Sequence, residues 1–215
     1  MTSYKSKYKD ENGQEEICFE SDGSSLKTRI RGIDFEGQSF EELEPIAGDL
    51  EKAQKIFYLG NFNYLSNCEI EVALPIRLCT LAGFIEEPLM VGVLLNESEE
   101  PELIKFALTI REDIFSLFEG MKEMSFEYQL PALQSLLPVG VHIKSCFFCA
   151  FSAYSVAGWS GFGSLICFKD IKEKIISVKS KEEYMDVAEG YGVSVQETFL
   201  CSEYEDIKAG QWQYK

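Results

Sequence analysis

The feature that most constrains this chain is an uncharged stretch of 24 residues, 145–168, with the sequence SCFFCAFSAYSVAGWSGFGSLICF. It is long enough to cross a membrane as a helix, which takes about 20 predominantly apolar residues. Five serines and three glycines make it too polar for that role. The Gly/Ser-rich residues 158–164 are typical of a turn, because glycine adopts positive φ and serine hydrogen-bonds to its own backbone. We therefore predict two short buried strands, at 141–151 and 163–168, joined by a loop, and no membrane span.

Much of the remaining chain has the period-2 alternation of half-buried strands. Apolar and polar residues alternate over 26–35, and shorter runs at 3–9 and 16–20 precede it. Asn-Gly and Asp-Gly turns separate these runs, which predicts a meander of antiparallel strands. Further strands are predicted at 68–81, 88–95, 103–110 and 193–201.

Short helices are predicted at four places. Ser-x-x-Glu capping boxes begin one helix at Ser39 and another at Ser180. Apolar residues at helical spacing predict two more, at 112–121 and 126–137, whereas 49–57 and 170–178 each leave helix and strand open. The predicted fold class is α+β: a mostly antiparallel sheet with a few short helices packed against it.

The length of 215 residues allows one domain with a sizeable core or two small ones. No repeat, linker or low-complexity tract divides the sequence, so we predict a single domain over 1–215. The alternative is a subdivision into a β-rich part, 1–111, and a part with helices and most cysteines, 112–215. The polar tail at 202–215 is expected to be weakly ordered, with Trp212 as the residue that could dock.

The charge of the chain limits its partners. There are 36 acidic and 20 basic residues, which gives a net charge of −16. Nucleic acids and anionic membranes are therefore disfavoured, because both bind through a surplus of cations. A basic protein partner is favoured through electrostatic steering, with plain solubility as the alternative reason for the charge. The first 16 residues lack the apolar core of a signal peptide, so a cytoplasmic location is expected.

Seven cysteines in a reducing compartment are free thiols, metal ligands or redox groups. Cys146 and Cys149 form a CxxC pair that could supply two ligands from one tight turn, and Cys167 and Cys201 could complete a four-cysteine zinc site. The second CxxC of most such sites is missing here. The alternative is that these residues are core cysteines, which pack as small hydrophobes.

Catalytic signals are weak. His142 is the one histidine, which excludes multi-histidine metal sites and leaves one base for a Cys-His or Ser-His pair. The residues after Cys149 are a poor helix, which disfavours a thioredoxin-like redox site. We predict no catalytic residues and lean toward a protein that is not an enzyme.

Three segments, CFFCAFSAYS at 146–155, GFGSLICFKD at 161–170 and VQETFLC at 195–201, resemble an uncharacterised bacterial family with a domain of unknown function. The pattern is C-x-x-C-x-F-S-x-Y, then F-G with C-F, then Q-E-T-[FY]-L-C, and the resemblance is strongest in the C-terminal third. Ala153 and Lys169 stand where that pattern has an acidic residue and an arginine. The resemblance implies no activity.

These observations favour a cytoplasmic, non-enzymatic binding protein. Its acidic, aromatic-rich composition is similar in style to immunity proteins, which inhibit bacterial toxins by binding a basic domain. The alternatives are a protein with a structural zinc site of unknown role, and an enzyme of unknown class that uses a cysteine or His142. No other cofactor is predicted.

Overall fold

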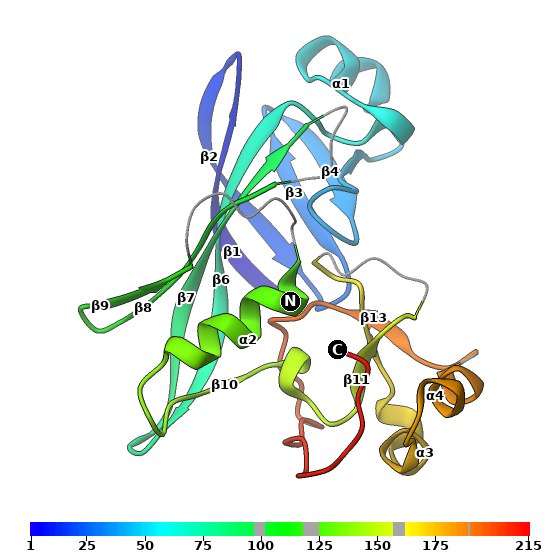
Figure 1. The fold of residues 1–215 in the computed structure, drawn as a ribbon. Helices are drawn as coiled ribbons and strands as arrows, with labels where there is room; N and C mark the ends of the chain where they lie inside the picture. The colour runs from blue at the N-terminus through cyan, green and yellow to red at the C-terminus, as the bar shows by residue number, and fades with distance from the viewer. Residues whose placement is uncertain (97–101, 118–124, 157–161, 189) are drawn as a thin grey trace. The chain divides into compact units, whose positions relative to one another are not determined.

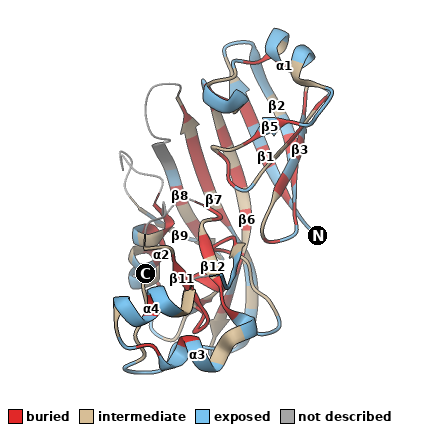
Figure 2. Cartoon of the chain, turned by 90° about the vertical axis from the view of Figure 1, so that its right-hand side faces the viewer, coloured by how far each residue is buried: buried red, intermediate tan, exposed pale blue. Residues whose placement is uncertain are grey.

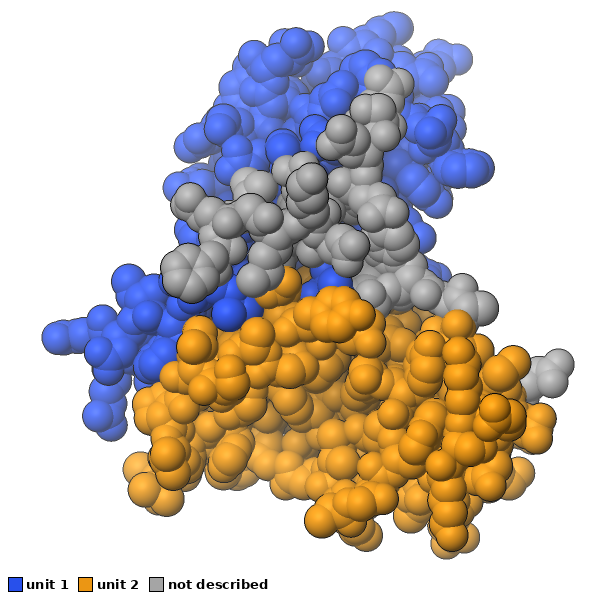
Figure 3. Space-filling model, viewed as in Figure 1, with its two compact units in different colours: residues 1–75, 87–125 blue, residues 76–86, 126–215 orange. Residues whose placement is uncertain are grey.

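The structure is a computed structural model that describes residues 1–96, 102–117, 125–156, 162–188 and 190–215 (Figure 1). The chain forms two compact units (Figure 3). Unit 1 comprises Met1–Pro75 and Glu87–Ser125, and unit 2 comprises Ile76–Glu86 and Phe126–Lys215. A mostly antiparallel sheet and a few short helices make up an α+β fold, which confirms the predicted class.

Unit 1 contains most of an antiparallel sheet in the order β5-β4-β3-β2-β1-β6-β7-β8-β9, and the residues of β6 and β7 that fall within Ile76–Glu86 belong to unit 2. Neighbours in the chain are mostly neighbours in the sheet, as expected for a meander joined by tight turns. The strands are β1 Thr2–Asp10, β2 Gly13–Ser21, β3 Leu26–Ile30, β4 Ile33–Gly37, β5 Glu44–Pro45, β6 Cys68–Thr80, β7 Gly83–Leu95, β8 Glu102–Ile110 and β9 Asp113–Ser116.

The predicted alternation is confirmed in β1, where Tyr4, Ser6 and Tyr8 are buried and the residues between them are exposed. Figure 2 shows buried residues in red along the strands of the sheet. Helix α1, Leu50–Ile56, is followed by Phe57, whose ring lies 5.9 Å from that of Tyr8 and meets it edge to face. Such aromatic pairs fill the core of unit 1.

Three predicted elements of unit 1 are wrong. The single strand expected at 26–35 is two strands, because Arg31 and Gly32 adopt positive φ, 48° and 82°, and reverse the chain. No helix begins at Ser39: the Leu65 N–H donates to the Leu43 carbonyl at 2.8 Å, and this tertiary bond holds 39–43 in turns. The helix expected at 112–121 gives way to β9, which pairs with β8; positions 118–121 lie outside the described residues.

Unit 2 contains a three-stranded antiparallel sheet in the order β11-β12-β13, and β10 pairs with the part of β6 that belongs to this unit. The helices predicted at 126–137 and from Ser180 are confirmed as α2 and α4, and 170–178 is largely helical. The elements are α2 Phe126–Leu136, β10 His142–Lys144, the 3-10 helix η2 Cys146–Phe148, β11 Ser152–Tyr154, β12 Leu165–Cys167, the 3-10 helix η3 Lys169–Ile171, α3 Lys172–Ser177, α4 Lys181–Ala188 and β13 Val193–Val195.

The strands predicted in unit 2 are shorter in the structure. Residues 141–151 contain β10 and the turn of η2 rather than one strand, because Cys146 and Phe147 donate their N–H groups to the downstream residues Phe199 and Glu197. The strand expected at 193–201 is shorter and ends at Val195. Beyond it, the carbonyls of Glu197 and Phe199 accept hydrogen bonds from the η2 turn.

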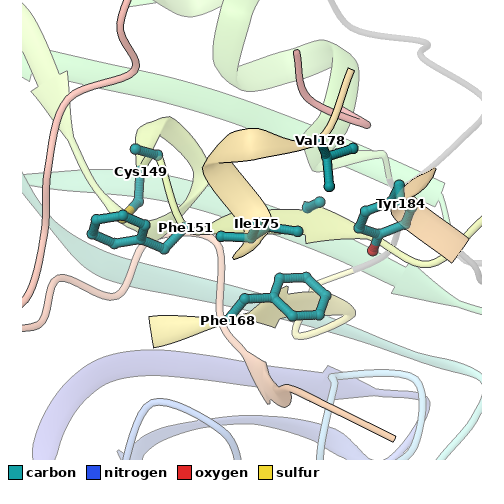
Figure 4. Close-up of a cluster of buried hydrophobic side chains, with 8 residues drawn as sticks. Cys149, Phe151, Phe168, Ile175, Val178 and Tyr184 are labelled. Atoms are coloured by element: carbon teal, nitrogen blue, oxygen red, sulfur yellow. The ribbon is translucent and has the colours of Figure 1, made fainter. Parts of the chain in front are cut away.

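The core of unit 2 gathers side chains of the uncharged stretch and of the helices that follow it. Cys149, Phe151 and Phe168 pack with Ile175 of α3 and Tyr184 of α4, and Figure 4 shows these side chains directed toward one another. Among the described residues, no helix combines the length and apolar character that a membrane crossing needs.

Candidate functional site

The CxxC turn and the Q-E-T-F-L-C segment lie against each other. The backbone N–H of Cys146 donates to the carbonyl of Phe199, and that of Phe147 donates to the carbonyl of Glu197 at 3.0 Å. The Ser152 hydroxyl closes the turn by donating to the carbonyls of Cys146 and Cys149. Because β12 also pairs with β11 and β13, all three segments singled out in the sequence meet in unit 2.

The four candidate metal ligands share this region. Cys146, Cys149 and Cys167 are buried and Cys201 is half-buried. Burial raises the pKa of the Cys146 thiol, and the other three thiols lie close enough to raise it further. Burial likewise raises the pKa of Cys167, with added contributions from Cys201 and Cys149. Neutral thiols at these positions pack as apolar groups and react slowly.

The side chains do not, as they stand, form a ligand set. Within the described ranges, no three His, Cys, Asp or Glu side chains are arranged to hold a metal ion. A zinc site with four cysteine ligands would require all four sulfurs at about 2.3 Å from one ion. Zinc binding by Cys146, Cys149, Cys167 and Cys201 therefore stays a prediction.

The tail that was expected to be weakly ordered is packed onto the CxxC turn, so that expectation is wrong. Gln211 Nε2 donates to the Ala150 carbonyl at 2.8 Å, and Gln213 Nε2 donates to the Cys149 carbonyl at 3.0 Å. Lys215 Nζ donates to the carbonyls of Phe147 and Cys149. Its burial lowers the pKa of Lys215 to about 7.

The aromatic residues of the tail, Trp212 and Tyr214, pack against Tyr184 of α4. The Trp212 ring lies 5.8 Å from that of Tyr184, and the Tyr214 ring stacks on Tyr184 at 6.0 Å, so Trp212 docks as anticipated. The sequence signal for this arrangement is QWQYK at 211–215, which alternates polar and aromatic residues. Such alternation is typical of an extended segment with two different faces.

Glu197 is a buried carboxyl group of unit 2, with no exposed surface. It accepts the N–H of Gly163 at 2.7 Å, the N–H of Leu165 at 3.2 Å and the hydroxyl of Tyr154 at 3.2 Å. Burial raises the pKa of Glu197 to about 8, against the opposing effect of these hydrogen bonds. Through these hydrogen bonds, Glu197 holds the segment that leads into β12 against β11.

His142 lies in a hollow of about 420 Å³, here called the β10 pocket. In the described part of the chain, no hydrogen bond joins His142 to a thiol or a hydroxyl, so the structure assembles no Cys-His or Ser-His pair around it. The Lys144 ammonium pairs with Asp206 and lies 5.4 Å from the centroid of the Tyr204 ring. The lining of the β10 pocket includes His142, Lys144, Phe148, Tyr204, Asp206 and Ile207.

The acidic charge is concentrated in unit 1. Two thirds of the 36 acidic residues belong to it, against just over half of the 20 basic ones. At one edge of its sheet, Glu36 of β4 stands directly opposite Glu44 of β5. Burial raises the pKa of the nearby Tyr64, and the charges of Glu42 and Glu44 raise it further. We call Glu36, Glu42 and Glu44 the acidic edge.

The chain was compared with known proteins, solved structures and protein families. No curated protein and no solved structure matched the chain. A family model described as Family of unknown function (DUF6304) matches residues 2–152, which include residues 146–152 of the first resembling segment. The segments at 161–170 and 195–201 lie outside the match, so the motif pattern of the C-terminal third is not confirmed. Because the match spans well over half of the sequence, the chain belongs to the Family of unknown function (DUF6304).

Proposed function

We propose that this protein is a non-enzymatic binding protein whose unit 1 receives a basic partner at the acidic edge. The observation that carries the proposal is the pair Glu36 and Glu44, placed directly opposite each other on adjacent strands. Like charges in this position destabilise a sheet by about 0.2–1 kcal/mol. A cationic group placed between them removes that repulsion.

The basic residues of the neighbouring strands leave this edge incompletely neutralised. Lys27 Nζ lies 3.1 Å from Glu36 Oε1, and Arg29 pairs with Asp34 at 3.8 Å. In the part of the chain that the structure describes, no basic side chain forms an ion pair with Glu44. The acidic edge therefore has an unmatched carboxylate that a lysine or arginine of a partner fits.

The specific form of the proposal is an immunity-type inhibitor of a bacterial toxin. Such an inhibitor acts by covering a basic surface and needs no catalytic residues. The net charge of −16 and its concentration in unit 1 support this form. Steering by charge also gives a fast association that weakens with salt.

The test uses a decalysine peptide as the probe and isothermal titration calorimetry as the readout. The variant Glu36→Gln/Glu44→Gln is expected to weaken binding about fivefold at low salt. Glu173→Gln/Asp186→Asn removes the same charge from exposed positions of unit 2 and is expected to leave the affinity within about twofold. Equal losses in both variants would show that net charge alone binds the peptide, and would refute the acidic edge.

A structural zinc site is a second proposal, and the proximity of Cys146, Cys149, Cys167 and Cys201 supports it. It requires the four side chains to turn toward a common ion. Protein purified under reducing conditions without chelator would then contain about one zinc per chain and four protected thiols. Metal-free protein of full stability would rule this site out. For an enzyme that uses a cysteine or His142, no arrangement of the described residues gives support.

A further inference from the structure

The β10 pocket carries two opposite charges on one wall. Lys144 Nζ pairs with Asp206 Oδ1, and the Tyr204 hydroxyl lies 2.7 Å from the same oxygen. Within the described ranges neither donor reaches Asp206 Oδ2, and the Asp206 side chain is 68% exposed, against 15% for Lys144. One carboxylate oxygen is therefore open to a ligand, while the ammonium keeps two of its three donors.

Apolar surface adjoins these charges. Phe148 is half-buried and Ile207 is 39% exposed, and both line the hollow together with the exposed imidazole of His142. The volume of about 420 Å³ lies within the usual range for small-ligand sites. The hollow can thus hold a molecule of about a dozen heavy atoms with one polar and one apolar end.

We propose that the β10 pocket binds a small zwitterion, an α-amino acid with an apolar side chain. Its carboxylate accepts hydrogen bonds from Lys144, its ammonium donates to Asp206 Oδ2, and its side chain packs on Phe148 and Ile207. Charge-assisted hydrogen bonds of this kind are the strongest that a partly exposed site offers.

The pairing of charges selects against simpler ligands. A carboxylate without an ammonium is attracted by Lys144 but repelled by Asp206, and an amine without a carboxylate meets the reverse. A zwitterion matches both charges at once, and specificity arises from the penalty on the mismatched ligands. All residues of the pocket belong to unit 2, so this inference is independent of the acidic edge.

The test compares three probes of similar size: L-phenylalanine, hydrocinnamate, which lacks the ammonium, and phenethylamine, which lacks the carboxylate. Each is titrated into the ¹⁵N-labelled full chain, and the amide signals of Lys144, Tyr204 and Asp206 are followed by NMR. We expect phenylalanine to bind with a Kd of about 1 mM, and the other two about tenfold more weakly.

Two variants that each remove one charge are expected to change the relative affinities of the three probes. Asp206→Asn removes the negative charge, so phenylalanine should weaken about tenfold while hydrocinnamate strengthens; Lys144→Gln should weaken phenylalanine and strengthen phenethylamine. Glu203→Gln is the matched control, because it removes a carboxylate from the ion pair with Lys172 outside the pocket. The proposal is overturned if no probe shifts the three amides at about 20 mM, about twenty times the expected Kd. It is equally overturned if the single-charge probes bind as tightly as phenylalanine, or if Glu203→Gln weakens binding as much as Asp206→Asn.

Discussion

The backbone N–H of Gly163 donates to the buried carboxylate of Glu197 at 2.7 Å, which joins the approach to β12 with the Q-E-T segment. This bond is made to a group whose pKa burial raises from 4.5 to about 8. The folded state therefore holds a proton on Glu197 between these pH values that the unfolded state releases. The contribution of Glu197 to the free energy of unfolding is fully present below about pH 4.5 and is lost as the pH rises through about 8.

We predict that Glu197→Gln flattens the pH dependence of the free energy of unfolding between pH 5 and 9. The wild type should lose a few kcal/mol more over this range, because one pKa unit corresponds to about 1.4 kcal/mol. At pH 5 the variant should be about 1–3 kcal/mol less stable, since an amide offers one acceptor oxygen where the carboxyl has two. Urea unfolding at three pH values measures this, and parallel curves for the two proteins would contradict it.

Gly192 gives a steric prediction for unit 2. A Cβ at this position would lie 2.4 Å from Ile166 Cγ2 and 3.0 Å from Phe168 Cε1, and the backbone has φ +102°. Gly192→Ala should lower the free energy of unfolding by about 3 kcal/mol through overpacking and backbone strain. Gly190→Ala is the matched control, because φ is +76° there but nothing lies within 4 Å of the Cβ. It should cost about 1 kcal/mol, the backbone part alone.

Arg31 and Asp10 form an ion pair in unit 1 with two hydrogen bonds of 2.6 Å, and their side chains are 20% and 6% exposed. Arg31→Met leaves a buried carboxylate without its cation, so we predict a loss of about 3 kcal/mol in unfolding free energy. Arg29→Met breaks the exposed pair with Asp34 and should cost no more than about 0.5 kcal/mol. Thermal unfolding compares the two variants, and equal shifts would show that the burial of the first pair has no energetic weight.

The packed tail predicts how fast the buried thiols react. Trp212→Ala removes the ring that lies 5.8 Å from Tyr184, which should loosen the segment that hydrogen-bonds to the Cys149 carbonyl. The reaction of Cys146 and Cys149 with a thiol reagent in native buffer should become at least about tenfold faster, because local opening governs access. Lys208→Ala changes an exposed residue of the same tail and should leave the rate unaltered. A Trp212→Ala rate equal to that of the wild type would mean that the tail does not protect these thiols.

The sheet of unit 1 could be predicted where local pattern and tertiary packing agree. In β1 the alternation of tyrosines with lysines is enough to predict the strand, because one face is buried and the other is exposed to solvent. At Ser39 the local capping signal is overruled by a tertiary hydrogen bond, which the Leu65 N–H donates to the Leu43 carbonyl at 2.8 Å. No local rule contains that contact. The apolar spacing at 112–121 is compatible with a helix, but Arg111 turns the chain at φ +57° and returns it along β8.

The sequence names the four cysteines of the candidate site, but not the groups that surround them. Burial and the influence of other thiols raise the pKa values of Cys146 and Cys167, and metal binding by Cys146, Cys149, Cys167 and Cys201 stays a prediction. The pairing of Lys144 with Asp206 joins residues 62 positions apart, which no spacing rule connects. The alternation in QWQYK can be seen in the sequence. The sequence does not show that the side-chain amides of Gln211 and Gln213 donate to backbone carbonyls of the CxxC region.

The hydrogen bonds from 211–215 to the CxxC turn also set an order of events during synthesis. When the ribosome has made residues 146–149, the groups that cover them are still more than 60 residues away in the chain, as the separation of 66 between Lys215 and Cys149 shows. At about 5–20 residues per second, that delay lasts about 3–13 seconds. The nascent chain therefore presents its two thiols uncovered for seconds, within reach of oxidants or chaperones, before unit 2 can close around them.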